Sequence, residues 1–265
     1  RRVESIALSL DPLLGEIRMQ MIHRAALCLA LLLAGNASHA LTATELVAKN
    51  VEAKGGAVAL QAVKSLRREG RLVVNGGQFV LELAETKQRP DSIRTEVSMQ
   101  GLAQVQAYDG KDGWRIDPFG GRKDPERMPA DDVREFIEDA SIDGVLPDAA
   151  AAGNLIEYLG TEDVDGTPAH KLKVMRKEGG VQYVYLDPDY FLEIRVESQR
   201  LVRGVKRTSV TDYGNYEKAG GVFWPLSIES GIKGEGDPAR FEYRSAVVNP
   251  TIAPDYFSFP ATAKK

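Results

Sequence analysis

The strongest structural signal in this chain lies at residues 71–83, which read RLVVNGGQFVLEL. Two runs of aliphatic, β-branched and aromatic residues flank the triplet Asn75-Gly76-Gly77. Asn-Gly steps adopt the positive φ angles of tight hairpin turns at little cost, and the flanking composition is typical of strands. Residues 71–83 therefore predict a β-hairpin.

One face of this hairpin is apolar. Leu72 and Val74 stand two residues apart in the first run, and Phe79, Leu81 and Leu83 follow the same spacing in the second. Successive side chains of a strand point to opposite faces, so each set shares one face. Polar or charged residues stand between most of them. We therefore expect this face to be the concave, interior side of a sheet.

Similar strand-like segments follow the hairpin through most of the chain. Alternating runs separated by Gly, Pro and Asp turns occur at 93–99, 103–108, 114–116, 155–160, 169–176, 181–187, 191–200, 204–213, 222–230 and 239–248. They predict roughly ten or eleven antiparallel strands, without the strand–helix–strand alternation of parallel sheets. So large a sheet curls into a barrel or partial barrel, and its inner face needs a cover.

A helical region before the strands can supply part of that cover. Thr42-Ala43-Thr44-Glu45 fits a capping box, which predicts a helix over 43–54 that stops at Gly55-Gly56. A second short helix is expected over 57–64.

A second helical region interrupts the strands at 131–152. Its apolar residues follow the helical spacing i, i+3, i+4, i+7 and are Val133, Phe136, Ile137 and Ala140. This apolar stripe needs the same interior as the hairpin face to bury against. A looser helical piece is expected over 145–152, before Gly153.

Together these elements predict a β-rich α+β fold, in which helices cover the concave face of a curved antiparallel sheet. We predict that seven residues line the enclosed apolar space and contact its ligand: Leu72, Val74, Phe79, Leu81, Leu83, Phe136 and Ile137. An apolar concavity with little chemistry favours a binder of acyl chains or of another hydrophobic ligand.

Composition and motifs argue against other function classes. The 265 residues carry a net charge of -4 without a basic block, which disfavours nucleic acid because phosphate contacts need clustered cations. No G-x-S-x-G, P-loop, H-E-x-x-H or C-x-x-C motif occurs. Residues 41–265 hold no cysteine and one histidine, His170, which excludes thiolate and two-histidine metal sites. We expect no metal, no cofactor and no enzymatic activity.

Isolated candidates are better explained by structure. His170 shares a predicted strand face with apolar neighbours, and without identifiable partners it is more simply a hydrogen-bonded or edge histidine than a general base. Trp114 and Trp224 each follow a Gly-containing turn and are expected as core side chains. Asp187-Pro188-Asp189 predicts a turn, and so does the Gly-rich stretch 231–236.

The first forty residues have features of export rather than of the fold. Residues 21–40 combine a basic start, an apolar run of about ten residues and a small-residue cleavage site, as secretory signal peptides do. That run is shorter than the roughly 20 residues needed to span a bilayer. We expect residues 1–20 to be an upstream artefact of gene-start assignment and 41–265 to form a single periplasmic domain. An exported chain without disulfides suits a bacterial periplasm.

The order of several motifs resembles that of the outer membrane lipoprotein-sorting, or LolA-like, superfamily. The matching stretches are 45–56, 63–66 with Gly70, 108–114, 166–172, 185–188, 212–216 and 221–225. The resemblance implies a LolA/LolB-like fold, an incomplete antiparallel barrel whose helices lid a hydrophobic cavity. It also implies a gating arginine, for which Arg67, Arg68 and Arg71 are all candidates here.

These observations lead to one expected function and one alternative. The expected function is that of a non-enzymatic periplasmic binder or carrier of lipid or lipoprotein acyl chains, or of another hydrophobic ligand. The alternative is a periplasmic protein-interaction or sensor module that presents its surface to an envelope protein. Neither involves nucleic acid or a membrane-spanning segment.

Overall fold

The computed structural model describes residues 41–260, apart from 178, 203 and 204. The predicted signal peptide (21–40) and the upstream segment (1–20) lie outside the described residues.

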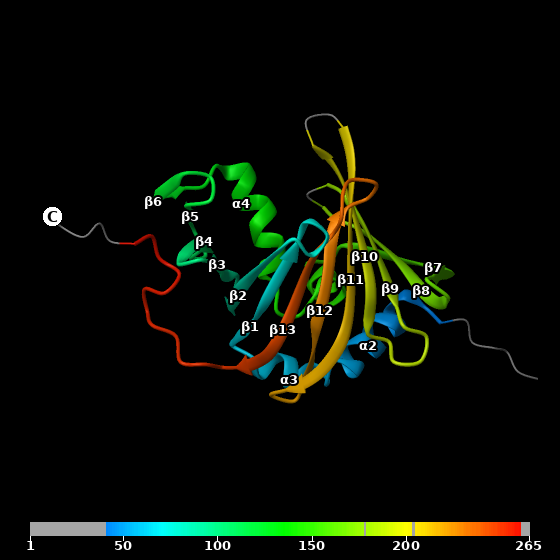
Figure 1. Cartoon of the computed structure of the whole chain (residues 1–265). Coiled ribbons are helices and arrows are strands. Elements are labelled where there is room, and N and C mark those ends of the chain that lie inside the picture. Colours follow the sequence, from blue (N-terminus) through cyan, green and yellow to red (C-terminus); the bar gives the residue numbers. More distant parts are fainter. Residues whose placement is uncertain (1–40, 178, 203–204, 261–265) are drawn as a thin grey trace, which may run out of the picture. The chain divides into compact units, whose positions relative to one another are not determined.

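A 13-stranded antiparallel sheet forms most of the described chain (Figure 1). Its strands are β1 (Ser65–Val74), β2 (Phe79–Gln88), β3 (Ser92–Met99), β4 (Leu102–Tyr108), β5 (Gly113–Asp117), β6 (Arg122–Arg127), β7 (Leu155–Val164), β8 (Thr167–Met175), β9 (Val181–Leu186), β10 (Glu193–Val202), β11 (Val205–Ala219), β12 (Val222–Ile232) and β13 (Ala239–Val248). The spatial order is β6-β5-β4-β3-β2-β1-β13-β12-β11-β10-β9-β8-β7.

The sheet is curved but open, because β6 and β7 remain its two edges and do not pair with each other. This confirms the expected β-rich antiparallel fold, and no closed barrel forms among the described strands. The strand count exceeds the predicted ten or eleven. The sequence of β6, RKDPER, gave no strand signal because it has no apolar alternation and contains a proline.

The hairpin at 71–83 is confirmed, and its strands extend further than predicted. Leu72 pairs with Leu81 and Val74 with Phe79, while Gly70 stands opposite Leu83. The five predicted apolar residues therefore share one face of the sheet. Asn75 adopts a φ of 51° in the connecting turn, as the Asn-Gly signal required.

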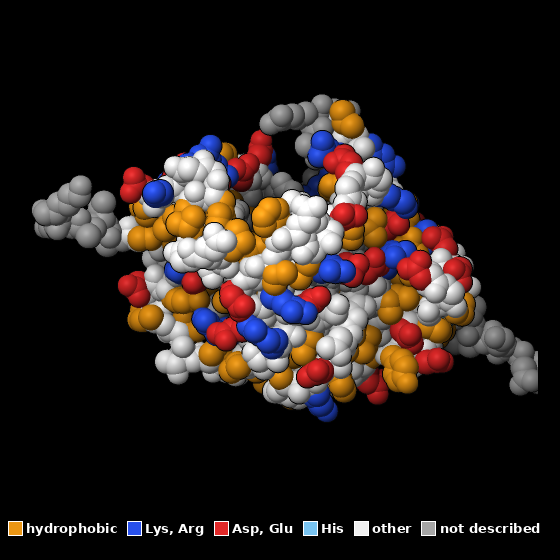
Figure 2. Space-filling view, viewed as in Figure 1, with side chains coloured by type: hydrophobic (Ala, Val, Ile, Leu, Met, Phe, Trp, Pro, Cys, Tyr) orange, Lys and Arg blue, Asp and Glu red, His pale blue; other side chains and the backbone are white. Residues whose placement is uncertain are grey.

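The opposite face of the same strands is polar. Arg71 in β1 pairs with Glu242 in the neighbouring β13 at 2.5 Å, and Arg244 in β13 reaches across β1 to Glu82 in β2 at 2.6 Å. Figure 2 shows basic and acidic side chains interspersed over this region. This contrast between the two faces is what the alternating sequence pattern predicted.

The helices are short and lie at three places in the chain. They are α2 (Ala43–Ala53), α3 (Ala57–Ala62), α4 (Ala130–Phe136) and α5 (Val145–Ala151), with 3₁₀ turns η1 (Asn75–Gly77) and η2 (Ile137–Ala140). The capping box is confirmed, because the Thr42 hydroxyl accepts from the Glu45 amide and the Glu45 carboxylate accepts from the Thr42 amide. The region 131–152 is broken into three pieces rather than continuous.

The helices cover the concave face, as expected. Leu60 and Val63, at and after α3, and Ile142, between η2 and α5, pack with three buried sheet residues, Leu66, Val222 and Trp224. The apolar stripe of α4 and η2 packs on Ile93 and Tyr108. This packing holds the segment 137–152 over the inner face of the sheet.

The C-terminal segment covers part of the outer face, which the sequence did not indicate. Trp114 is 1% exposed, and its indole donates to the backbone oxygen of Phe257 at 2.8 Å. Phe259 packs edge-on against the same ring, and Arg94 donates to the backbone oxygen of Tyr256 at 2.8 Å. Gly113, the residue before Trp114, pairs with Tyr108, whose side chain packs against the helices. Successive residues of a strand face opposite sides of the sheet. Trp114 and its contacts therefore lie on the side away from the helices.

Candidate functional site

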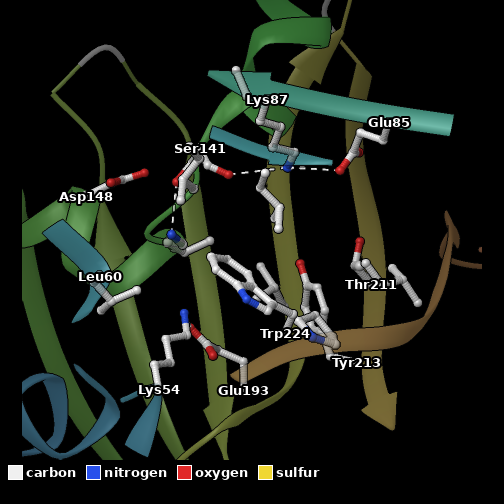
Figure 3. Close-up of a pocket in the computed structure, with 18 of the residues that line it drawn as sticks. Lys54, Leu60, Glu85, Lys87, Ser141, Asp148, Glu193, Thr211, Tyr213 and Trp224 are labelled. Carbon is white, nitrogen blue, oxygen red and sulfur yellow. Dashed lines mark hydrogen bonds and ion pairs between the residues drawn. The ribbon is translucent and has the colours of Figure 1, made fainter. Parts of the chain in front are cut away.

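A cavity of about 570 Å³ lies between the concave face of the sheet and the helical cover. Its walls come from β1, β2 and β10 to β13, from the C-terminal end of α2, and from the segment 137–152 (Figure 3). The cavity thus draws on parts of the chain that are far apart in sequence.

Much of the wall is apolar. Leu60, Leu66, Ile142 and Trp224 contribute from the core cluster beneath the helices. A second apolar stretch, made by Ile228, Phe241 and Tyr243, continues the wall along β12 and β13.

One side of the cavity holds a buried ion pair between neighbouring strands. Arg68 binds Glu85 through two nitrogens, at 2.6 and 3.1 Å, and its third nitrogen donates to the backbone oxygen of Pro225. Lys87 approaches the same Glu85 oxygen at 3.7 Å and donates to the backbone oxygen of Ser141. Burial opposes ionisation of Glu85, but Arg68 and Lys87 outweigh it and hold the pKa of this carboxyl below its ordinary value.

A second buried pair, Lys54 with Glu193, lies apart from the first (Figure 3). The two charged atoms are 2.5 Å apart, and Lys54 also donates to the backbone oxygen of Asp143 at 3.0 Å. Lys54 ends α2, and its own backbone oxygen accepts from the Phe223 amide, which ties the helix to β12. Gly144, in the loop beside Lys54, adopts a φ of 93°, a backbone conformation that glycine reaches without strain.

The loop between η2 and α5 carries further charges beside this pair. Arg89 forms a two-point ion pair with Asp143, one of its bonds being 2.7 Å long. Asp148, in α5, lines the cavity. Burial raises the pKa of the Asp148 carboxyl above its ordinary value; Asp143 adds to this, while a hydrogen bond with Ser141 opposes it.

The structure separates the seven residues predicted to line the site. Only Ile137 is part of the cavity wall. Leu72 and Leu83 lie next to the cavity wall, because they pack in the same cluster as the wall residue Tyr243. Phe136 packs against Ile93 and Tyr108, Leu81 is buried at 9% exposure beside Leu72, and Val74 and Phe79 lie at the hairpin tip, where Phe79 is 44% exposed. Ligand contact by these residues stays a prediction.

Of the three candidate arginines, only Arg68 faces the cavity. Arg67 points to the other side, where it binds Glu69 and the Tyr256 hydroxyl. Arg71 is exposed and pairs with Glu242.

Apart from Arg68, sequence reasoning missed the charged wall residues, although part of the signal was present. The alternation that placed Leu83 inside continues to Glu85 and Lys87, and the partner strand continues from Leu72 through Gly70 to Arg68. Charges at inward positions of a strand indicate a buried pair or a site. Lys54, Asp148 and Glu193 carried no such local signal.

The remaining candidates have structural roles. The Nδ1 atom of His170 lies 2.9 Å from the Tyr158 hydroxyl, and its ring stacks on Phe191, outside the cavity wall. Trp114 is a core side chain, and Trp224 belongs both to the core and to the cavity wall. Within the described part of the chain, no group of three or more His, Cys, Asp or Glu side chains is placed to hold a metal ion. None of the helices in that part is long and apolar enough to cross a membrane.

No protein-family model and no curated protein matches this sequence. Solved structures match it in fold. A LolA superfamily protein from Nitrosomonas europaea gives a TM-score of 0.53 at 14% identity, covering 83% of this chain and 98% of that one. A DUF1329 family protein from Desulfovibrio piger gives 0.54 at 14% identity, covering 81% and 96%. A domain from Vibrio parahaemolyticus, described as an outer membrane lipoprotein-sorting protein, gives 0.51 at 13% identity, covering 80% and 97%. At such low sequence identities, the structural similarity shows a shared fold.

Proposed function

We propose that this chain, which has the LolA-like fold, is a non-enzymatic periplasmic binder or carrier of acyl chains or of another hydrophobic ligand. The observation that carries the proposal is the cavity of about 570 Å³ between sheet and helices. Ligand pockets in proteins usually measure about 300–1,000 Å³ and are lined mainly by apolar side chains with a few polar groups. This cavity matches that description in size.

The polar groups of the wall favour binding over catalysis. Arg68 is paired with Glu85 and Lys54 with Glu193, so these charges are used to hold the structure. His170 lies outside the wall.

An acyl chain longer than the cavity has an apolar path toward the hairpin. Leu72 and Leu83 pack around Tyr243 and Phe241, which are themselves wall residues, and Leu81 follows next to Leu72. We propose that the predicted seven residues continue the binding surface from the cavity along the inner face.

Export to the periplasm is part of the proposal and rests on residues 21–40. The mature protein is expected to begin near Leu41 and to be released by osmotic shock. Recovery of an uncleaved chain from the cytosol would contradict it.

Filling the cavity tests the proposed binding. Thr211 lies in the wall, and its neighbour Val210 points to the opposite face of β11. Thr211→Phe is expected to weaken binding of a fluorescent fatty acid by roughly tenfold or more, since the larger ring occupies the ligand space. Val210→Phe, the matched control, is expected to bind as the unaltered protein does.

The outcomes separate the cavity from other modes of binding. Circular dichroism establishes that both variants are folded before their binding is compared. Equal binding by both variants would place the ligand outside the cavity. Absence of binding by the unaltered protein, both of the fatty acid and of the other single-chain amphiphiles named below, would contradict the proposed function.

A protein partner is a second candidate function, favoured by one surface feature. Val80, at 51% exposure, and Leu102 line a shallow hollow of about 360 Å³ between the β1–β2 and β3–β4 turns. Exposed apolar patches on otherwise polar surfaces often mark interaction sites. Val80→Lys together with Leu102→Lys is expected to abolish a partner complex without affecting fatty-acid binding, as measured by co-purification and by fluorescence.

A further inference from the structure

One oxygen of Glu193 is buried in the cavity wall without a hydrogen-bond partner in the protein. The Glu193 side chain is 7% exposed, and its Oε1 atom binds Lys54 while Oε2 has no donor among the described atoms. Two nearby donors are engaged elsewhere. The Tyr216 hydroxyl donates to the backbone oxygen of Glu193, and Lys54 also serves the backbone oxygen of Asp143. A buried carboxylate oxygen left unpaired is costly, so this atom needs a donor from outside the protein.

Asp148 is a further carboxylate of the cavity wall, and it forms no ion pair with a described residue. The charges of this region are balanced in number. The carboxylates are those of Glu85, Asp143, Asp148 and Glu193, and the cations are Lys54, Arg68, Lys87 and Arg89. The unpaired oxygen of Glu193 is therefore the feature that a ligand can satisfy.

We propose that the cavity selects an amphiphile with a cationic amine, whose ammonium group binds Glu193 Oε2 while its apolar chain occupies the space beside Trp224. The inference rests on the proposed function, because it names the ligand class for the same cavity. A primary ammonium supplies a hydrogen-bond donor for this oxygen, and its positive charge strengthens the bond to a carboxylate. The apolar wall beyond it accommodates a chain.

Three ligands with one chain length test the selectivity. Dodecylamine, dodecanol and dodecanoate share an apolar chain and differ in the charge of the polar end. We expect dodecylamine to bind at least about tenfold more tightly than either of the others at pH 7, as measured by titration calorimetry below the micellar concentration.

Two variants and a control locate the effect. Glu193→Gln keeps the shape of the side chain and removes its charge, and it is expected to remove most of the preference for the amine. Asp148→Asn removes the charge of a wall carboxylate that Figure 3 shows apart from Glu193, and it is expected to change the preference less than Glu193→Gln does. Asp189→Asn removes an exposed carboxylate outside the cavity, and its preference should equal that of the unaltered protein.

The outcomes distinguish this inference from the proposed function. If dodecanoate binds as tightly as dodecylamine, the amine selectivity is wrong and the hydrophobic-ligand function stands. If none of the three ligands binds, the proposed function itself fails. An amine preference that persists in a folded Glu193→Gln overturns the assignment to this carboxylate.

A final comparison identifies the source of the amine. Lysophosphatidylethanolamine and lysophosphatidylglycerol differ in the amine of the head group. Tighter binding of the former by roughly tenfold supports recognition of a phospholipid amine, and equal binding with retained selectivity for dodecylamine supports a simple amine amphiphile.

Discussion

At the scale of single residues, the cavity depends on charges that are buried in pairs. Arg68 and Glu85 are cross-strand partners on β1 and β2, and both are largely removed from water. Such a pair contributes little net stability compared with apolar side chains, but removing one member leaves an uncompensated charge inside the protein.

Arg68→Met is therefore expected to destabilise the fold by about 3–5 kcal/mol. Replacing Glu85 by Met in the same chain should recover part of the loss, because the uncompensated carboxylate is removed while Lys87 loses one of its partners. Urea unfolding of the single and double variants measures both effects. A single variant within about 1 kcal/mol of the unaltered protein would show that water solvates Glu85 inside the cavity.

Asp148 is expected to make stability depend on pH in the opposite sense to a paired carboxylate. Its pKa is raised above the ordinary value of 3.8 by burial, so the folded state binds the proton more tightly than the unfolded state. Ionised Asp148 therefore costs stability at pH 7, and the cost disappears as the pH falls below 3.8.

Asp148→Asn should thus raise the free energy of unfolding at pH 7, with an advantage that shrinks as the pH falls toward 3.8. Urea unfolding at pH 7 and pH 4 provides the comparison. A variant that is less stable than the unaltered protein at pH 7 would contradict the assigned cost of burial.

At the scale of elements, the β1–β2 hairpin determines how far the binding surface extends. Leu81 points inward and Val80 outward, so adjacent residues report on opposite faces. The cavity wall ends before Leu81, so a bound chain that contacts Leu81 must extend beyond the cavity.

Leu81→Glu is expected to leave the protein folded and to abolish uptake of a fluorescent fatty acid, because an unpaired carboxylate on the apolar path costs several kcal/mol. Val80→Glu, at an exposed position, should change neither folding nor binding. Circular dichroism and fluorescence measure the two properties. A folded Leu81→Glu variant with unchanged binding, or an unfolded one, would exclude the hairpin from the ligand path.

At the scale of the whole described chain, the two faces of the sheet are covered by different segments. The helices cover the concave face, and the segment after β13 covers Trp114 on the outer face. Stability and binding are therefore separable, because the C-terminal segment contacts the face without the cavity.

A chain that ends at Ile252 is expected to lose about 3 kcal/mol or more, since Trp114 loses both its packing against Phe259 and its hydrogen bond to Phe257. Indole emission should shift to longer wavelength as Trp114 meets water. At temperatures where the shortened chain remains folded, its fatty-acid affinity should be unchanged. A weakened affinity in the folded chain would show that the outer segment also shapes the cavity.

The sequence by itself determined the features that depend on neighbouring residues. The Asn75 turn and the capping box at Thr42 follow from local backbone preferences, and the alternation of apolar and polar residues is sufficient to place Leu72 and Leu81 on one face. The order of motifs also implied the LolA-like fold that the solved structures share.

Only the tertiary structure decided which residues form the cavity. Lys54 and Glu193 are 139 positions apart, and their contact depends on how the sheet curves and where α2 docks on β12. Periodicity specifies which face a side chain occupies and carries no information about its distant partner. The covering of Trp114 by Phe257 and Phe259 was hidden for the same reason, because an irregular segment has no repeating pattern to reveal where it packs.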